Sequence, residues 1–365
     1  MALIMIIKKI LRFLFRPNRI HIEKFYKASL SSSEPGLTGW SSRRETTLRV
    51  IIEGKEYLSQ RISRPDAPHA FYLGLPNLNG IDGFTVEYLR GSNWVPFRKF
   101  LRPAQKNTSD DIDDFPQLRK AVFIHAYYPD ILKEILSQLK NIKDHFDAYI
   151  FIPEGSPMHE AYKTGQTYDI PSPEILVGES KGRDMGGFLQ LARHVLEAKK
   201  EYDACLVVHT KKSPQFSENM ATAWRTILVN SLVGSEAVSN SALKLLFSEE
   251  NINLVGSQDF LHHYTLTRGV GNYSRYVQLC RLFNLPVQNT DFIAGTMFWI
   301  KFSVLKEHLT SDRLTKAIDL LEQGAYPEPS YAHAWERFIG RLATSGGGKI
   351  KGLQYPSEFL ELSIK

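Results

Sequence analysis

The feature that most constrains the fold of this chain is an alternation of strand-like and helix-like segments that begins near residue 118. Four short, largely apolar runs have the pattern of buried strands: KAVFIHAYY, FDAYIFIP, EILVGE and YDACLVVH. Helical patterns lie among them, one opening at Pro129 with Asp130 as its candidate N-cap and one near residues 185–199. This alternation predicts an α/β fold with a doubly wound, mostly parallel sheet.

Polar residues that follow these runs indicate where a ligand would bind. A doubly wound sheet binds its ligand at the carboxyl ends of its strands. His125, residues 182–184 and residues 209–212 come at such positions, so we expect them to gather at one edge of the sheet. The chain contains no Walker A or GxGxxG pattern, which argues against an ATPase and against a typical dinucleotide enzyme.

The chain length predicts a second, smaller region beside the α/β domain, because 365 residues exceed the usual size of one core. Short β-rich runs separated by Gly, Asn, Asp and Pro predict a small β-rich accessory module over residues 44–104. A spacer or packing role is favoured for this module over carbohydrate binding. Residues 29–43, rich in Ser, Gly and Pro, are typical of a linker. Asp111 and Asp113 form a DxD pattern, but they lie in a polar linker ahead of any strand and are not expected to bind metal.

The N-terminal segment carries most of the net charge. The chain has a net charge of +6, and residues 1–22 hold five Lys or Arg and no Asp or Glu. Lys8, Arg12 and Arg16 recur every four residues beside a largely apolar surface, which predicts an amphipathic, basic, membrane-associating helix within residues 1–28. This helix is too short to span a bilayer, which takes about 20 apolar residues. A helix that packs on the following domain is the alternative.

The order of charges and the two cysteines favour a cytoplasmic location. The basic residues of the N-terminal segment follow its apolar stretch, and no small-residue cleavage site comes after them, so it is a poor signal peptide. Cys205 and Cys280 lie far apart without CxxC spacing, which gives neither a disulfide framework nor a zinc site. Because the rest of the chain is near neutral, a nucleic-acid partner is disfavoured. We expect a protein that is peripheral on the inner face of the cell membrane.

Seven segments in a fixed order add a family resemblance between about residues 120 and 340: FIHAYYPDILKEI, FDAYIFIP, KGRDMGGFL, YDACLVVHTKKS, AWRTIL, AGTMFWIK and YAHAWERFIG. Through them the chain resembles the rhamnan synthesis protein F family of polysaccharide glycosyltransferases. The resemblance implies a GT-A-like domain, assigned to residues 118–365, that transfers rhamnose or a related sugar from a dTDP- or UDP-linked donor. The implied acceptor is a lipid-linked glycan in the synthesis of lipopolysaccharide O-antigen, capsule or rhamnan of the bacterial cell envelope.

The strand-end motif VVHTKKS lacks the acidic DxD that holds a divalent cation in many enzymes of the GT-A fold. Thr210, Lys211 and Lys212 stand in its place, and a lysine ammonium can offset the charge of a donor diphosphate directly. We therefore expect metal-independent transfer with no metal cofactor. The alternative is that the two lysines form a solvated turn after the buried strand. His209 either orients the diphosphate or hydrogen-bonds to the backbone.

A second donor-binding segment is SKGRDMGG, between a strand and a helix, where glycines allow close approach of a ligand. We expect Arg183 to hold phosphate and Asp184 to accept from a ribose or a base edge, although Asp184 is also well placed as a helix N-cap. The resemblance implies nucleotide contact for His125 and Tyr127 at the end of the first strand. Core packing is the alternative for the tyrosine.

The acceptor side is expected in DFIAGTMFWIK and AHAWERF. Glu336 is the candidate base that takes the proton of the acceptor hydroxyl, and His333 lies on the same helical face, so the two would form one polar site. Thr296 and Trp299 are candidate acceptor-binding residues. An ordinary salt bridge or cap contact is the alternative for Glu336, and a buried core position is the alternative for Trp299.

Two other classes of function remain open from the sequence. The absence of DxD would permit a non-catalytic assembly or regulatory protein that keeps the transferase fold. The HTKKS and HAWER motifs argue against such a loss of catalytic activity. Nucleic-acid binding is the third class, and it would require a basic face that spreads over the folded domain.

Overall fold

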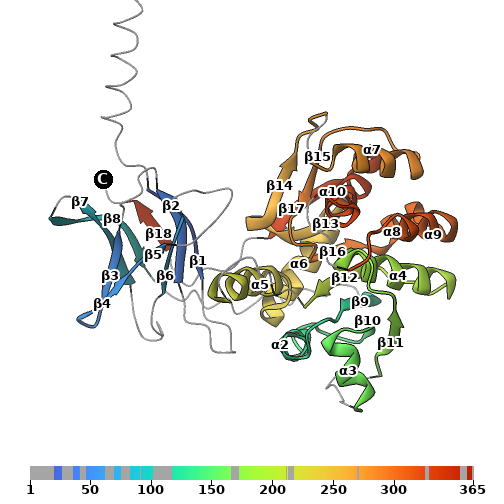
Figure 1. The fold of residues 1–365 in the computed structure, drawn as a ribbon, viewed down its shortest axis with the longest axis horizontal. Coiled ribbons are helices and arrows are strands. Elements are labelled where there is room, and N and C mark those ends of the chain that lie inside the picture. The colour runs from blue at the N-terminus through green and yellow to red at the C-terminus, as the bar shows by residue number, and fades with distance from the viewer. Residues whose placement is uncertain are drawn as a thin grey trace, which may run out of the picture. The chain divides into compact units, whose positions relative to one another are not determined.

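The computed structural model describes residues 20–26, 36–41, 47–61, 70–74, 83–90, 92–101, 117–165, 172–210, 212, 218–268, 271–324, 329–353 and 360–363 (Figure 1). The chain divides into two compact units, which we describe separately. Unit 1 comprises Met1–Ser109, Ser213–Ala223 and Ser357–Lys365, and unit 2 comprises Asp110–Lys212 and Trp224–Pro356. Residues 1–19, which carry most of the expected amphipathic helix, and the Asp111–Asp113 pattern lie outside the described residues.

Unit 1 contains two antiparallel sheets, with strand orders β1-β2-β6-β5 and β18-β8-β7-β3-β4. Alternate residues of β3 and β7 are buried, as is Leu73 of β6, because one face of a strand packs inward while the other meets solvent. This arrangement confirms the predicted β-rich module. Its strands are β1 (Ile20–Tyr26), β2 (Gly36–Ser41), β3 (Leu48–Ile52), β4 (Lys55–Leu58), β5 (Gln60–Arg61), β6 (Ala70–Gly74), β7 (Gly83–Arg90), β8 (Asn93–Leu101) and β18 (Leu360–Ser363).

Three strands of unit 1 correct the domain boundaries that the sequence predicts. Residues 20–26 were expected in a helix but form β1, which pairs with β2. Residues 36–41 were expected in a linker but form β2, which pairs with both β1 and β6. Residues 360–363 were expected in the α/β domain over 118–365 but form β18, which pairs with β8 of unit 1. The pairing of β2 with β6 and of β18 with β8 joins segments that are distant in the sequence, and such pairing leaves no signal in the local residue pattern.

Unit 2 is built on a seven-stranded sheet with the order β11-β10-β9-β12-β16-β13-β17. All neighbours are parallel except β16, which runs antiparallel to β12 and β13. The predicted α/β fold with a mostly parallel sheet is therefore confirmed. The strands are β9 (Lys120–His125), β10 (Phe146–Pro153), β11 (Glu174–Gly178), β12 (Ala204–His209), β13 (Ile252–Ser257), β16 (Phe298–Lys301) and β17 (Lys349–Leu353).

Helices cover both faces of this sheet, and β14 (Leu261–Tyr264) and β15 (Thr290–Ile293) form a separate two-stranded antiparallel sheet. Figure 1 shows α4 and α6 on either side of the sheet, in agreement with the packing of α4 on β9 and β10 and of α6 on β13 and β16. The helices are α2 (Pro129–Leu139), α3 (Pro157–Lys163), α4 (Arg183–Glu197), α5 (Glu218–Val233), α6 (Glu236–Ser248), α7 (Tyr273–Leu282), α8 (Phe302–His308), α9 (Ser311–Asp319) and α10 (Tyr331–Ala343).

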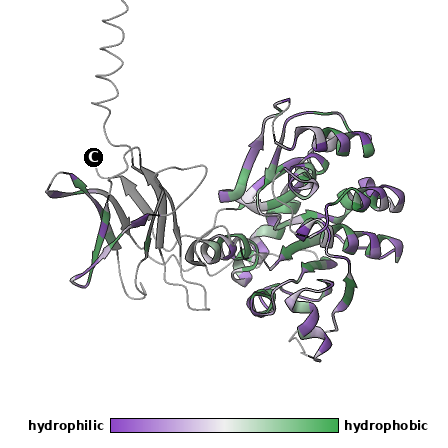
Figure 2. Cartoon of the chain, viewed as in Figure 1, coloured by the Kyte–Doolittle hydropathy of each residue, from purple (hydrophilic) through white to green (hydrophobic). Residues whose placement is uncertain are grey.

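The core of unit 2 lies on the two central strands. Every residue of β9 and β12 is buried, because helices cover a parallel sheet on both faces. Figure 2 shows this as hydrophobic colouring along the central strands, with hydrophilic residues on outward helix faces. The N-cap of α2 is Tyr128, without a side-chain cap, so the expectation that Asp130 caps this helix is wrong; Asp130 is in the first turn.

Two helical glycines let α4 and α10 approach the sheet region closely. A Cβ on Gly187 of α4 would lie 2.4 Å from Cδ2 of His125, at the end of β9. A Cβ on Gly340 of α10 would lie 2.0 Å from the carbonyl oxygen of Asp291 in β15. Both approaches depend on the missing side chain, and they bring the start of α4 and the residues of α10 to the same edge of the sheet.

Within the described part of the chain, we find no helix with both the length and the apolar character needed to cross a bilayer.

Candidate active site

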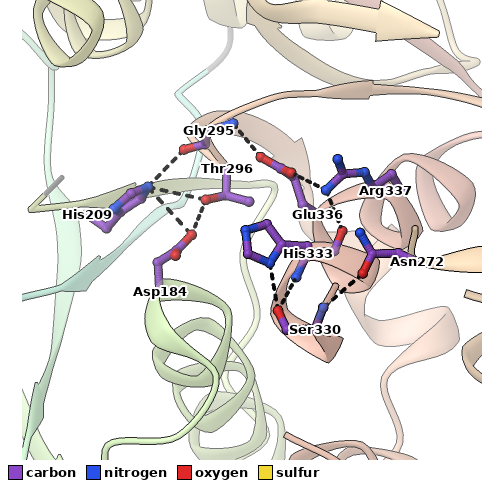
Figure 3. Close-up of polar contacts among 9 residues, drawn as sticks. All are labelled: Asp184, His209, Asn272, Gly295, Thr296, Ser330, His333, Glu336 and Arg337. Atoms are coloured by element: carbon purple, nitrogen blue, oxygen red, sulfur yellow. Dashed lines mark hydrogen bonds and ion pairs between the residues drawn. The ribbon is translucent and has the colours of Figure 1, made fainter. Parts of the chain in front are cut away.

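Side chains from three separate elements meet at a turn between β15 and β16 (Figure 3). His209 is the last residue of β12, and its Nε2 donates to the carbonyl oxygen of Gly295 at 2.8 Å. The same nitrogen lies 3.2 Å from Oγ1 of Thr296 and 3.6 Å from Oδ2 of Asp184. The strand end predicted to bind a donor is therefore tied to a segment that sequence reasoning assigned to the acceptor side.

Asp184 provides the second contact with the turn. The Thr296 hydroxyl donates to Oδ2 of Asp184, near the start of α4. The N-cap of α4 is Gly182, which makes no side-chain cap contact, so Asp184 is not the helix cap. About a quarter of the Asp184 side chain is exposed, and its carboxylate accepts the hydrogen bond from Thr296.

Two residues near these contacts have a strained backbone. Thr296 has φ of 52° and Arg183 has φ of 54°, both in the left-handed region that L-residues rarely adopt. For Thr296 the conformation is a genuine outlier, because its side chain is branched at Cβ. Such strain persists where the surrounding contacts over-determine the backbone, and it clusters at functional sites.

Glu336 of α10 provides the third contact with the turn. Its Oε1 accepts the Gly295 N–H at 2.7 Å, and its Oε2 pairs with Nη1 of Arg337 at 2.7 Å. The Arg337 guanidinium lies over the Phe292 ring at 5.2 Å from its centroid. Glu336 thus has a salt bridge, as the alternative interpretation expects, but its other oxygen is directed at the turn that Thr296 and His209 share.

His333 lies one turn earlier on α10 and is oriented by a different partner. Its Nδ1 is 2.6 Å from Oγ of Ser330, the N-cap of α10, and the Ser330 N–H donates to Oδ1 of Asn272 at 2.9 Å. Figure 3 shows the His333 ring on the side of the helix that faces Asp184 and Thr296. The structure therefore brings His333 and Glu336 to one region but gives no direct contact between them among the described interactions.

His125 ends β9 as a buried residue at the rim of a small pocket. Its ring, 9% exposed, stacks on Phe151 with centroids 5.9 Å apart. Burial lowers the pKa of His125 to about 4, against the opposing effect of the nearby Asp184 carboxylate, so the imidazole is neutral at physiological pH. The pocket is lined by Phe123, His125, Asp184, Met185, Phe188, Leu191, Val207, Val208, His209 and Thr296.

Thr210 has a structural role at the site that the sequence prediction, which placed it at the strand end, did not assign. Its Oγ1 accepts the N–H groups of Tyr127 at 2.7 Å and Tyr128 at 3.1 Å, while its own N–H donates to the carbonyl oxygen of His125 at 3.1 Å. One hydroxyl thus fixes the loop after β9 to the end of β12. Its signal in the sequence is a buried polar residue directly after an apolar strand, which needs partners.

The cations of the predicted donor site differ in their surroundings. Lys212 pairs with Asp130 at 3.1 Å and lies over the Tyr128 ring at 4.5 Å, with 45% of its side chain exposed. Arg183 is exposed at the start of α4, and no ion pair to it is recorded among the described residues. Lys211 lies outside the described residues. Arg183 is therefore the cation best able to meet an anionic ligand at this helix N-terminus.

Trp299 is a correction to the predicted site. It is fully buried in β16, and its indole N–H donates to the carbonyl oxygen of Leu232 at 3.5 Å. An aromatic face inside the core cannot stack on an acceptor sugar, so the core alternative holds for this residue.

A metal centre is not evident in the described part of the chain, where no three His, Cys, Asp or Glu side chains are arranged to hold an ion. The groups that could meet a cation or a ligand at the rim of the pocket are Asp184, His209 and His125.

Comparisons with known proteins give one family and a remote structural likeness. The family model described as rhamnan synthesis protein F matches residues 85–347. A search of curated proteins gives no match. Among solved structures the chain is similar to the mannosyltransferase PcManGT from Pyrobaculum calidifontis, solved in complex with GDP-Man and Mn2+. This likeness has 12% identity and a TM-score of 0.29, and it covers 62% of this chain and 59% of the length of that one.

Acidification should destabilise the protein through His125. The free imidazole of the unfolded chain takes up a proton near pH 6.5, whereas the folded residue has a pKa of about 4. Between these values the unfolded state binds more protons, so the free energy of unfolding should fall by about 2 kcal/mol between about pH 7 and pH 5. Urea denaturation of the wild type and of His125→Phe at both pH values measures this contribution. Identical pH dependence in the two proteins would contradict it.

Proposed function

The chain belongs to the rhamnan synthesis protein F family, and from this premise we propose that it is a glycosyltransferase of bacterial surface-polysaccharide synthesis. It transfers a sugar, rhamnose or a related one, from a dTDP- or UDP-linked donor to a lipid-linked glycan. The observation that carries the proposal is the convergence of Asp184, His209 and Glu336 on one strained turn at the carboxyl edge of a mostly parallel sheet.

The donor lies at the edge formed by β9, β12 and the start of α4. Arg183 meets the diphosphate, supported by the exposure of its guanidinium and by the N-terminal end of a 15-residue helix. Asp184 accepts from a donor hydroxyl. The neutral ring of His125 and the phenol of Tyr127 contact the nucleoside, and Lys211 and Lys212 add positive charge after β12.

The acceptor hydroxyl loses its proton to Glu336 in a transfer with inversion. The acceptor oxygen then forms a bond to the anomeric carbon while the bond from that carbon to the diphosphate oxygen breaks, and the nucleoside diphosphate leaves with the electron pair. Arg337 orients the carboxylate through Oε2, and Oε1 makes one recorded hydrogen bond. Since a carboxylate oxygen has two lone pairs, Oε1 can accept a second hydrogen bond, from the acceptor hydroxyl.

Glu336→Gln should abolish transfer while leaving donor binding intact. The amide oxygen of glutamine can still accept the Gly295 N–H, but the amide cannot take a proton, and loss of a general base costs about 10²- to 10⁴-fold in rate. Release of dTDP from dTDP-rhamnose in the presence of isolated bacterial membranes measures turnover, and calorimetry with dTDP measures binding. Glu307→Gln, a change at an exposed position on α8, is the control. Wild-type turnover in Glu336→Gln would end the assignment.

Transfer should not require a divalent cation. The residues after β12 are Thr210, Lys211 and Lys212, which lack carboxylates for a metal and supply positive charge for the leaving diphosphate. Turnover is therefore expected to survive exhaustive EDTA treatment. Loss of turnover that added Mn2+ restores would show that the reaction needs the metal.

The basic N-terminal segment supports a location of this activity at the inner face of the cytoplasmic membrane. Its five Lys or Arg residues would meet anionic lipid, at about 1 kcal/mol per basic residue near the surface. A lipid-linked acceptor would reach the enzyme at the same surface.

A further inference from the structure

Both backbone polar groups of Gly295 are held, each by a different element. Glu336 of α10 accepts its N–H at 2.7 Å, and His209 of β12 donates to its carbonyl oxygen at 2.8 Å. Gly295 therefore links the end of β12 to α10 through a single amino acid (Figure 3).

The neighbouring Thr296 is held in a strained conformation. It is 5% exposed with φ of 52°, and its hydroxyl donates to Asp184. A β-branched residue keeps such a backbone only where its contacts fix it. The Asp184 contact and the proximity of His209 Nε2 to the Thr296 hydroxyl, 3.2 Å, are such contacts.

The turn packs closely against Leu228 of α5. Gly295 has φ of 90°, and a Cβ at this position would lie 2.7 Å from Cδ1 of Leu228. Because the carbonyl that His209 holds and the N–H that Glu336 accepts belong to the same residue, a shift of the Gly295 carbonyl also shifts this N–H.

We propose that His209 is a positioning residue: it holds the Gly295–Thr296 turn so that the Gly295 N–H keeps the Glu336 carboxylate at the acceptor hydroxyl. This inference rests on the proposed function, in which Glu336 is the base. It reassigns His209, which the sequence placed among the donor-binding residues. The reassignment follows from its burial, with 6% of the residue exposed, and from the engagement of Nε2 with the turn.

The kinetic test separates positioning from donor binding. His209→Ala removes the donor to Gly295, and a displacement of a catalytic group by about 1 Å costs on the order of 10²-fold in rate. We expect kcat for release of dTDP from dTDP-rhamnose to fall about 10²-fold, with the donor KM and the Kd for dTDP within about twofold of wild type. His209→Gln, whose amide N–H can donate to the same carbonyl, should recover most of the rate.

A second readout reports the turn without any turnover. Amide hydrogen exchange in peptides that cover residues 290–298 should be faster in His209→Ala than in wild type, and near wild type in His209→Gln. His194→Ala is the matched control, because this histidine is on α4 and pairs with Glu174 on β11, away from the turn. Thr296→Val, which keeps the side-chain shape but loses the hydroxyl, should show the same loss of kcat and faster exchange even if His209→Ala does not fold.

The outcomes distinguish the inference from the function on which it rests. A weakened donor KM and Kd with unchanged kcat in His209→Ala would make His209 a donor ligand and overturn the inference. Wild-type exchange in both His209→Ala and Thr296→Val would also overturn it. Turnover in Glu336→Gln, by contrast, would remove Glu336 as the base while the exchange results still decide whether His209 holds the turn.

Discussion

The site depends on one constraint, the fixing of the Gly295–Thr296 turn between β12, α4 and α10. His209, Asp184 and Glu336 each contribute one hydrogen bond to it. These contacts are possible because Gly187 lets α4 lie against the end of β9 and Gly340 lets α10 lie against β15. Thr296 keeps its strained backbone within this convergence, which joins the proposed donor region of the sheet to the proposed base.

Much of the α/β unit could be predicted from the sequence, because buried parallel strands leave continuous apolar runs that local reasoning detects. The runs that predict β9, β10, β11 and β12 all form strands. The strands β1, β2 and β18 could not be predicted in the same way. Their partners supply the hydrogen bonds, and β18 pairs with a strand that precedes it by more than 250 residues.

For the candidate site, the sequence predicts which residues lie together better than it predicts the hydrogen bonds between them. His125, Asp184 and His209 are grouped correctly, because the ends of parallel strands and the following helix meet at one edge. The link from His209 to Gly295 spans 86 positions and uses a backbone carbonyl, which no residue pattern encodes. The prediction that Trp299 binds an acceptor was wrong, because a tryptophan has the same local sequence whether it lies in a core or on a sugar-binding surface.

The edge formed by β9, β12 and α4 is the proposed binding site for a nucleoside diphosphate. Thermal unfolding of the full chain with dTDP, UDP, GDP or ADP is the direct measurement of such binding. A ligand that binds only the folded state raises the unfolding midpoint. We expect dTDP or UDP to raise the midpoint by a few degrees without added metal, and Arg183→Ala to reduce this shift. A midpoint that none of the four nucleotides raises would contradict nucleotide binding at this edge.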